Sequence, residues 1–126
     1  MPQWSETKLK GVHPDLVRVV LRAHRLAPDG FVITEGLRTL ARQQQLFAAG
    51  ATRTMNSRHL TGHAVDLAAL VAGQVRWDWP LYAALAGIMK EAASQEGVPI
   101  EAGADWRTFR DGPHFQLPFA DYPKGA

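Results

Sequence analysis

The sequence predicts an α+β fold in which a small antiparallel sheet is flanked by about three helices. Helical periodicities alternate with short strand-like runs along the 126 residues. The last two strand candidates lie close together and are joined by short turns, which favours an antiparallel sheet over a doubly wound parallel one. The length fits one domain, residues 1–126, which can bury a core without disulfides.

The first half of the chain predicts two helices separated by a strand. HPDLVRVVLRAHRLAP, residues 13–28, is a helix candidate in which Pro14 suits an opening position. Apolar residues recur there at helical spacing: Leu16, Val19, Val20 and Ala23. The β-branched run FVIT, residues 31–34, predicts a buried strand. TLARQQQLFAAG then predicts a second helix, with Thr39 as N-cap and Gly50 as its stop.

The second half predicts a loop, a third helix and three strands. ATRTMNSRHLTG is polar and rich in turn residues, and we expect a surface loop. AVDLAALV predicts a strand, and further strands are expected near residues 100–102 and 114–117. DWPLYAALAGIMKEAASQEG predicts the third helix, opened by Asp78 and Pro80 and closed near Gly97. Its expected core stripe is Leu81, Leu85, Ile88, Met89 and Ala92.

Composition narrows the class of protein. There are no cysteines, so any metal must be held by His, Asp or Glu. The net charge is only +2, without the dense basic and aromatic cluster typical of nucleic-acid binding. No run resembles a signal peptide or a membrane span. We therefore expect a monomer made in a cytoplasm, with no nucleic-acid partner and no stable membrane association.

The stretch SRHLTGHAVD, residues 57–66, concentrates residues that can bind a metal. A catalytic zinc site needs three protein ligands and one open position for water. His59 and Asp66 are seven residues apart, with Gly62 allowing a turn, and an aspartate inside an apolar strand is costly to bury unless something compensates it. His114 in RDGPHFQL is the candidate third ligand. Taken singly, His59 could be an ordinary loop histidine, and Asp66 could be a cap or part of a buried salt bridge. His114 could be a strand residue with a satisfied hydrogen bond.

Two further residues could take part in the chemistry. Asp111, three residues before His114, could exchange protons with a water activated by the metal, or could simply begin an Asp-Gly turn. Arg38 could hold a substrate carboxylate or a developing oxyanion, or could pair only with Glu35 or Asp29.

The other histidines carry weaker signals. His63 lies four residues after His59, a helical metal-binding spacing, but the intervening Leu-Thr-Gly argues against a helix. We therefore interpret His63 as a bystander or as a group behind the ligands. His13 and His24 are expected on the surface of the first helix region.

Together these motifs resemble a known family. SRHLTGHAVD resembles the SxHxxGxAxD signature of zinc-dependent D-alanyl-D-alanine peptidases, and WRTFRDGPHFQ resembles their second motif. With TEGLRTLARQQQLFAAG upstream, the chain is most similar to the phage-type L-alanyl-D-glutamate endopeptidases, endolysins that cut the stem peptide of peptidoglycan. Relatives that trim D-Ala-D-Ala ends carry glutamate where Asp111 stands, and Asp105 and Glu101 are competing carboxylates.

The resemblance implies a site and an activity. His59, Asp66 and His114 would bind Zn²⁺, Asp111 would be the catalytic acid/base, Arg38 would contact substrate and Ser57 would line the cleft. The implied function is a zinc-dependent peptidoglycan endopeptidase that cleaves the L-Ala–D-Glu bond, encoded by a phage or prophage and held in the host cytoplasm until release. The alternatives are a D,D- or L,D-carboxypeptidase, a tail-associated wall-opening protein, and a non-catalytic zinc-stabilised domain as in hedgehog signalling proteins.

Overall fold

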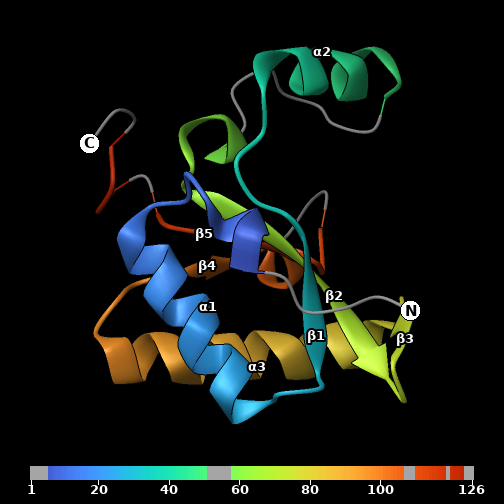
Figure 1. The fold of residues 1–126 in the computed structure, drawn as a ribbon, viewed down its shortest axis with the longest axis vertical. Helices are drawn as coiled ribbons and strands as arrows, with labels where there is room; N and C mark the ends of the chain where they lie inside the picture. Colours follow the sequence, from blue (N-terminus) through green and yellow to red (C-terminus); the bar gives the residue numbers. More distant parts are fainter. Residues whose placement is uncertain (1–5, 51–57, 107–109, 119, 124–126) are drawn as a thin grey trace.

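Figure 1 shows the chain as a computed structural model, which describes residues 6–50, 58–106, 110–118 and 120–123. Its three α-helices are α1 (Pro14–Leu26), α2 (Leu40–Ala48) and α3 (Trp79–Glu96). Three short 3-10 helices are η1 (Glu6–Leu9), η2 (Arg58–Thr61) and η3 (Gly103–Asp105). The strands are β1 (Phe31–Glu35), β2 (Ala64–Val71), β3 (Gln74–Arg76), β4 (Glu101–Ala102) and β5 (His114–Gln116).

The five strands form one antiparallel sheet in the order β1-β2-β5-β4, and β3 extends β2 as a hairpin. Strand β2 is central because it pairs with β1 on one side and with β5 on the other. The α+β class predicted from the close spacing of the late strands is therefore confirmed.

One face of the sheet is covered by helices. Val65, Leu67 and Ala69 alternate along β2 and join the hydrophobic core, to which α1 and α3 contribute most of the other buried apolar side chains. Helices α1 and α3 pack directly against each other (Figure 1). Because successive side chains of a strand point to opposite faces, Asp66 lies on the face away from this core.

Helix α2 stands apart from the other two helices, at the top of Figure 1. The Thr39 hydroxyl accepts a hydrogen bond from the backbone N–H of Arg42 at 3.1 Å, as the predicted N-cap should. Among its residues only Gln43 is buried. Since Gln43 points toward the polar face of the sheet, α2 contributes to the site described below more than to the core.

The predicted core stripe of the third helix is partly wrong. Leu85, Met89 and Ala92 are buried as expected, but Leu81 and Ile88 are only partly buried. The buried face instead includes Tyr82, Ala86 and Ala93. Tyr82 can be buried because its hydroxyl donates to the carbonyl of Arg76 at 2.7 Å and accepts from the N–H of Ala69 at 3.1 Å.

Three smaller differences from the prediction concern a short strand, the loop before β2 and two histidines. Strand β3 was not predicted, because three residues after a tight turn at Ala72 and Gly73 carry too short a pattern. The expected loop over residues 51–62 contains the 3-10 helix η2, and residues 51–57 lie outside the described part of the chain. His13 and His24 are half-buried rather than exposed, and His13 caps α1 by accepting from the N–H of Asp15 at 3.1 Å.

No helix in the described residues is long and apolar enough to cross a bilayer.

Candidate metal centre

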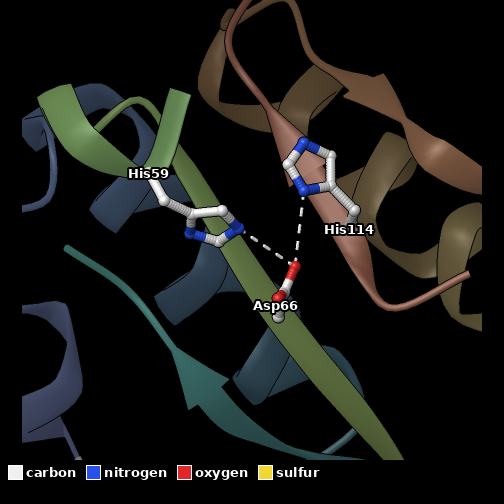
Figure 2. Close-up of side chains that lie close together, drawn as sticks. All are labelled: His59, Asp66 and His114. Atoms are coloured by element: carbon white, nitrogen blue, oxygen red, sulfur yellow. Dashed lines mark hydrogen bonds and ion pairs between the residues drawn. The ribbon is translucent and has the colours of Figure 1, made fainter. Parts of the chain in front are cut away.

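The three residues predicted as metal ligands meet on the face of the sheet opposite the helices (Figure 2). In the β2–β5 pair, Asp66 lies directly opposite His114. Their neighbours Val65 and Phe115 point into the core, so the alternation of each strand directs Asp66 and His114 to the same polar face. Strand register thus brings together two residues that are 48 positions apart in the sequence.

His59 reaches the same point from η2, just before β2. The turn between them needs a glycine at position 62, whose φ is +77°. A Cβ added there would lie 2.3 Å from the carbonyl oxygen of Gly11, so neither the conformation nor the space accepts a side chain. The close packing of Gly62 on Gly11 holds η2 where the His59 ring can face Asp66.

The donor atoms of the three side chains converge. His59 Nε2 lies 3.2 Å from Asp66 Oδ1, and His114 Nδ1 lies 3.4 Å from the same oxygen. One ligand atom from each residue lies within 4.8 Å of the others. His59 and His114 are only 2% and 7% exposed, while Asp66 is half-buried. The two imidazoles are therefore fixed by packing, and the carboxylate is the most exposed of the three side chains.

Hydrogen bonds behind the histidines decide which nitrogen can bind a metal. His59 Nδ1 donates to the carbonyl oxygen of Gly36 at 2.9 Å, because a carbonyl can only accept. His114 Nε2 donates to Oε1 of Gln116 at 2.7 Å. Nε2 of His59 and Nδ1 of His114 face Asp66, and once their protons are lost their lone pairs point at the centre, the arrangement common for metal-binding histidines.

This donor set fits zinc. Two neutral imidazoles and one carboxylate, without thiolates, are a known ligand combination for catalytic zinc. The fit also rests on where the protons lie. Nδ1 of His59 and Nε2 of His114 carry protons that they donate away from the centre, which leaves the other nitrogen of each ring for the metal.

Electrostatics at the centre favour a charged carboxylate. Desolvation opposes the ionisation of Asp66, but hydrogen bonds from His114 and His59 hold its pKa well below the usual range. Burial likewise opposes a charge on His114, yet its hydrogen bond with Asp66 raises the pKa of the imidazole above the ordinary value. In the metal-free protein the carboxylate is thus ionised and ready to bind a cation.

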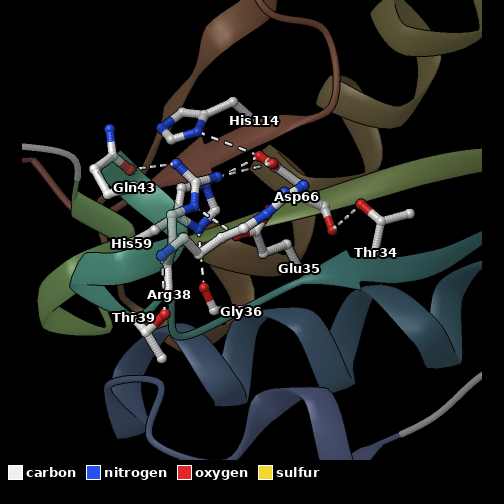
Figure 3. A network of polar contacts seen from close by, with 10 residues as sticks. Thr34, Glu35, Gly36, Arg38, Thr39, Gln43, His59, Asp66 and His114 are labelled. Carbon is white, nitrogen blue, oxygen red and sulfur yellow. Dashed lines mark hydrogen bonds and ion pairs between the residues drawn. The ribbon is translucent and has the colours of Figure 1, made fainter. Parts of the chain in front are cut away.

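Arg38 belongs to a network beside the metal ligands (Figure 3). It is buried, its Nε donates to Glu35 and its Nη1 donates to Oε1 of Gln43 at 2.7 Å. Its Nη2 lies 3.8 Å from Asp66 Oδ2. Of the two pairing alternatives raised from the sequence, Glu35 is the observed partner, and the guanidinium also faces the oxygen of Asp66 that the histidines leave free.

Asp111 lies beside the centre without joining the three ligands. Its carbonyl oxygen accepts from the N–H of His114 at 3.1 Å, and its own N–H donates to Gly103. Desolvation, and then the negative charge of Asp66, raise the pKa of its carboxyl above the ordinary value. Because the residue as a whole is exposed, solvent screening limits the size of this shift.

The competing carboxylates already have partners. Asp105 is exposed and pairs with Lys90 at 2.5 Å, and Glu101 accepts from Nε2 of Gln116 at 3.3 Å. The carboxyl of Asp111 forms no hydrogen bond or ion pair with the other described residues, which leaves it available for proton transfer.

The remaining predicted residues are placed as follows. His63 is not part of the convergent group: it is buried, and its Nδ1 lies 2.6 Å from the hydroxyl of Thr61. Ser57 lies outside the described residues. Sequence reasoning missed Gln116 and Gly36, which support the two histidines. Gln116 could have been found, because it follows His114 by two positions and so shares its face of the strand.

A small antiparallel sheet that carries a His-Asp-His group on its polar face is an arrangement suited to a metallopeptidase of α+β fold. A sequence model of the family described as "Phage L-alanyl-D-glutamate peptidase" matches residues 1–118. The chain belongs to this family. The resemblance seen in its two motifs is confirmed, and with it the prediction of a peptidoglycan endopeptidase.

Two individual relatives carry the same name as the family. The chain is 34% identical to the L-alanyl-D-glutamate peptidase of Escherichia phage T5 over 85% of this chain and 81% of that protein. It is 35% identical to the enzyme of that name from Listeria phage A118, over 72% of this chain and 31% of that longer protein.

Solved structures show the same fold. The Serratia marcescens L-Ala D-Glu endopeptidase ChiX superposes with a TM-score of 0.90 at 50% identity, covering 98% of this chain and 92% of ChiX. The D,D-dipeptidase VanXYg shares the fold at a TM-score of 0.60 and 19% identity, covering 84% of this chain and 50% of that one.

Proposed function

We propose that this chain is a zinc-dependent endopeptidase that cleaves the L-Ala–D-Glu bond of the peptidoglycan stem peptide. The observation that carries the proposal is the convergence of His59, Asp66 and His114, with donor atoms within 4.8 Å and both histidine tautomers already set for a metal. The names of the phage T5 protein and of ChiX support the choice of bond.

The chemistry divides between the metal and the chain. A bound zinc ion supplies Lewis-acid polarisation of the scissile carbonyl and lowers the pKa of water to about 7. His59, Asp66 and His114 would hold the ion. Asp111 takes the proton from the attacking water and returns it to the leaving amine, and its raised pKa suits a group that must carry the proton between the two steps.

Arg38 is proposed to contact the substrate through Nη2, because its Nε already donates to Glu35 and its Nη1 to Gln43. From that position it would steady a substrate carboxylate or the developing oxyanion and would also limit the rotation of Asp66. Arg38→Lys keeps the charge but loses the planar fork. A raised KM with unchanged metal content would support a substrate contact, whereas a loss of metal would indicate that Arg38 only positions Asp66.

The biological setting follows from the same proposal. We infer a monomeric endolysin encoded by a phage or prophage, which is held in the host cytoplasm and acts on the wall after release. Ser57, by its place in the signature, is proposed to line the cleft.

The deciding experiment is mass spectrometry of purified peptidoglycan after digestion. Wild-type protein should release stem peptides that begin at D-Glu, the release should stop with a chelator, and zinc should restore it. Release of D-alanine alone would replace the proposal by a carboxypeptidase. A zinc-loaded protein that cuts nothing would replace it by a binding domain.

A further inference from the structure

Two tryptophans are exposed beside the candidate centre. Trp77, just before α3, and Trp79, its first residue, are 63% and 49% exposed. They line a hollow of about 220 Å³ together with Tyr82, Arg110 and Asp111. Large aromatic side chains gathered on an open hollow are a common mark of a binding surface.

The aromatic rings are held in place before any ligand arrives. The Trp77 ring stacks on Tyr82 with centroids 5.9 Å apart and planes 6° apart. Tyr82 is itself fixed by the two hydrogen bonds of its hydroxyl. Trp77 therefore presents its outer face as a preorganised platform, which lowers the entropic cost of binding.

Arg110 adds hydrogen-bond donors to this surface. Its guanidinium lies 4.6 Å from the ring centroid of Trp79, and its Nε donates to the carbonyl of Ala104 at 3.0 Å. Since Nε is used in this bond, the terminal nitrogens are the groups that the guanidinium can offer to a ligand in the hollow. The site thus combines flat apolar faces with fixed polar donors.

The hollow continues in two directions. On the other side of Trp79 and Arg110, a second hollow of about 350 Å³ extends along α3 past Gly87 and Lys90. At its other end the first hollow reaches Asp111, whose carbonyl oxygen is hydrogen-bonded to the N–H of the metal ligand His114. We call the two hollows together the aromatic groove. It adjoins the candidate centre through Asp111.

We propose that the aromatic groove binds the glycan strand of peptidoglycan, with an N-acetylated sugar stacked on Trp77 and Trp79. The inference rests on the proposed function and deepens it. In peptidoglycan the amine of L-Ala is joined to the lactyl group of N-acetylmuramic acid, so a sugar lies one residue from the L-Ala–D-Glu bond. A substrate positioned for cleavage must place that sugar next to the centre.

The chemistry of the groove matches a sugar. Pyranose rings have apolar C–H faces that pack on indoles, and their hydroxyl and acetamido groups accept hydrogen bonds from a guanidinium. A nucleic acid would be expected to meet a denser positive charge than a chain of net charge +2 offers. The groove therefore selects for glycan-attached stem peptides over free ones.

The first test is binding of a disaccharide of N-acetylglucosamine and N-acetylmuramic acid that carries no peptide. We expect the indole N–H resonances of Trp77 and Trp79 to shift during an NMR titration of the full chain, with or without zinc. Trp77→Ala and Trp79→Ala should weaken binding, while Leu26→Ala, which removes an exposed apolar side chain from the end of α1, should not. Absence of any shift at these two indoles would overturn the proposal.

The second test compares two substrates, a stem peptide still attached to its disaccharide and the same peptide free. We expect the ratio of kcat/KM for the attached over the free peptide to fall about tenfold in Trp77→Ala, as for the loss of one aromatic contact. Leu26→Ala should leave the ratio unchanged. An unchanged ratio in both tryptophan variants would overturn the glycan site and leave the endopeptidase intact. A protein that cuts neither substrate would overturn the proposed function, and the disaccharide titration would still decide the glycan site.

Discussion

The side-chain oxygen of Gln116 lies 2.7 Å from Nε2 of His114. The side chain of Gln116 is itself oriented by a second hydrogen bond, since its amide nitrogen donates to Glu101 on the neighbouring strand β4 at 3.3 Å. The contact keeps the His114 proton on Nε2 and leaves Nδ1 for the metal. A chain of contacts thus connects the edge of the sheet with the metal centre.

Removing this support should weaken metal binding without removing a ligand. We expect Gln116→Leu to lower zinc affinity about 10–100-fold, since the His114 ring loses the acceptor that fixes its tautomer and orientation. Competition with a chelator of known affinity measures the change. Gln95→Leu, which removes an exposed amide on α3, is the matched control. Equal affinities for Gln116→Leu and wild type would show that packing alone orients His114.

The two histidines of SRHLTGHAVD should behave differently. His59→Ala should lose bound zinc and activity together, because His59 Nε2 is one of three convergent donors. His63→Ala should keep a full equivalent of zinc and instead lower the free energy of unfolding by about 1–3 kcal/mol, as for other truncations of buried side chains. Metal analysis and urea denaturation separate the two effects. Loss of zinc from His63→Ala would contradict the ligand assignment.

Asp111 should matter for turnover and not for metal content. We expect Asp111→Asn to retain zinc and to lower kcat by about two to four orders of magnitude, the usual contribution of a general acid/base. Asp105→Asn removes a carboxyl that is exposed and paired with Lys90, so its kcat should stay near wild type. A large loss in Asp105→Asn and a small one in Asp111→Asn would reverse the two roles.

The sequence was most informative where one strand carries both a core face and a polar face. PHFQ shows this alternation, and AVDLAALV is an apolar run with one aspartate, so the positions of Asp66 and His114 within strands could be predicted. The sheet class followed from the short spacing of the late strands. That these two residues lie opposite each other depends on the register of β2 against β5, which is set by long-range packing and by no local signal. The family resemblance implied only that the two residues bind the same zinc ion.

Other features depended on tertiary contacts that local patterns do not contain. The buried face of α3 differs from the predicted stripe because Tyr82 finds two hydrogen-bond partners, one on β2 and one at the end of β3. The supporting role of Gly36 depends on the approach of η2 to the end of β1, and a Cβ at Gly36 would lie 2.1 Å from the carbonyl of Lys8. Neither contact has a signature in the neighbouring residues.

The C-terminal segment is attached to α1 by a hydrogen bond that should make stability depend on pH. The Tyr122 hydroxyl donates to Asp15 at 2.6 Å and is the main cause that lowers the pKa of Asp15 below its ordinary 3.8. This stabilisation is complete above pH 3.8 and is lost as the pH falls through the lower folded-state pKa. Tyr122→Phe should therefore be less stable by about 1 kcal/mol at neutral pH, and the difference should shrink in acid. Urea denaturation of metal-free protein at several pH values measures it. In an Asp15→Asn background the effect of Tyr122→Phe should not vary over this acid range, and a wild-type difference that grows in acid would contradict the assignment.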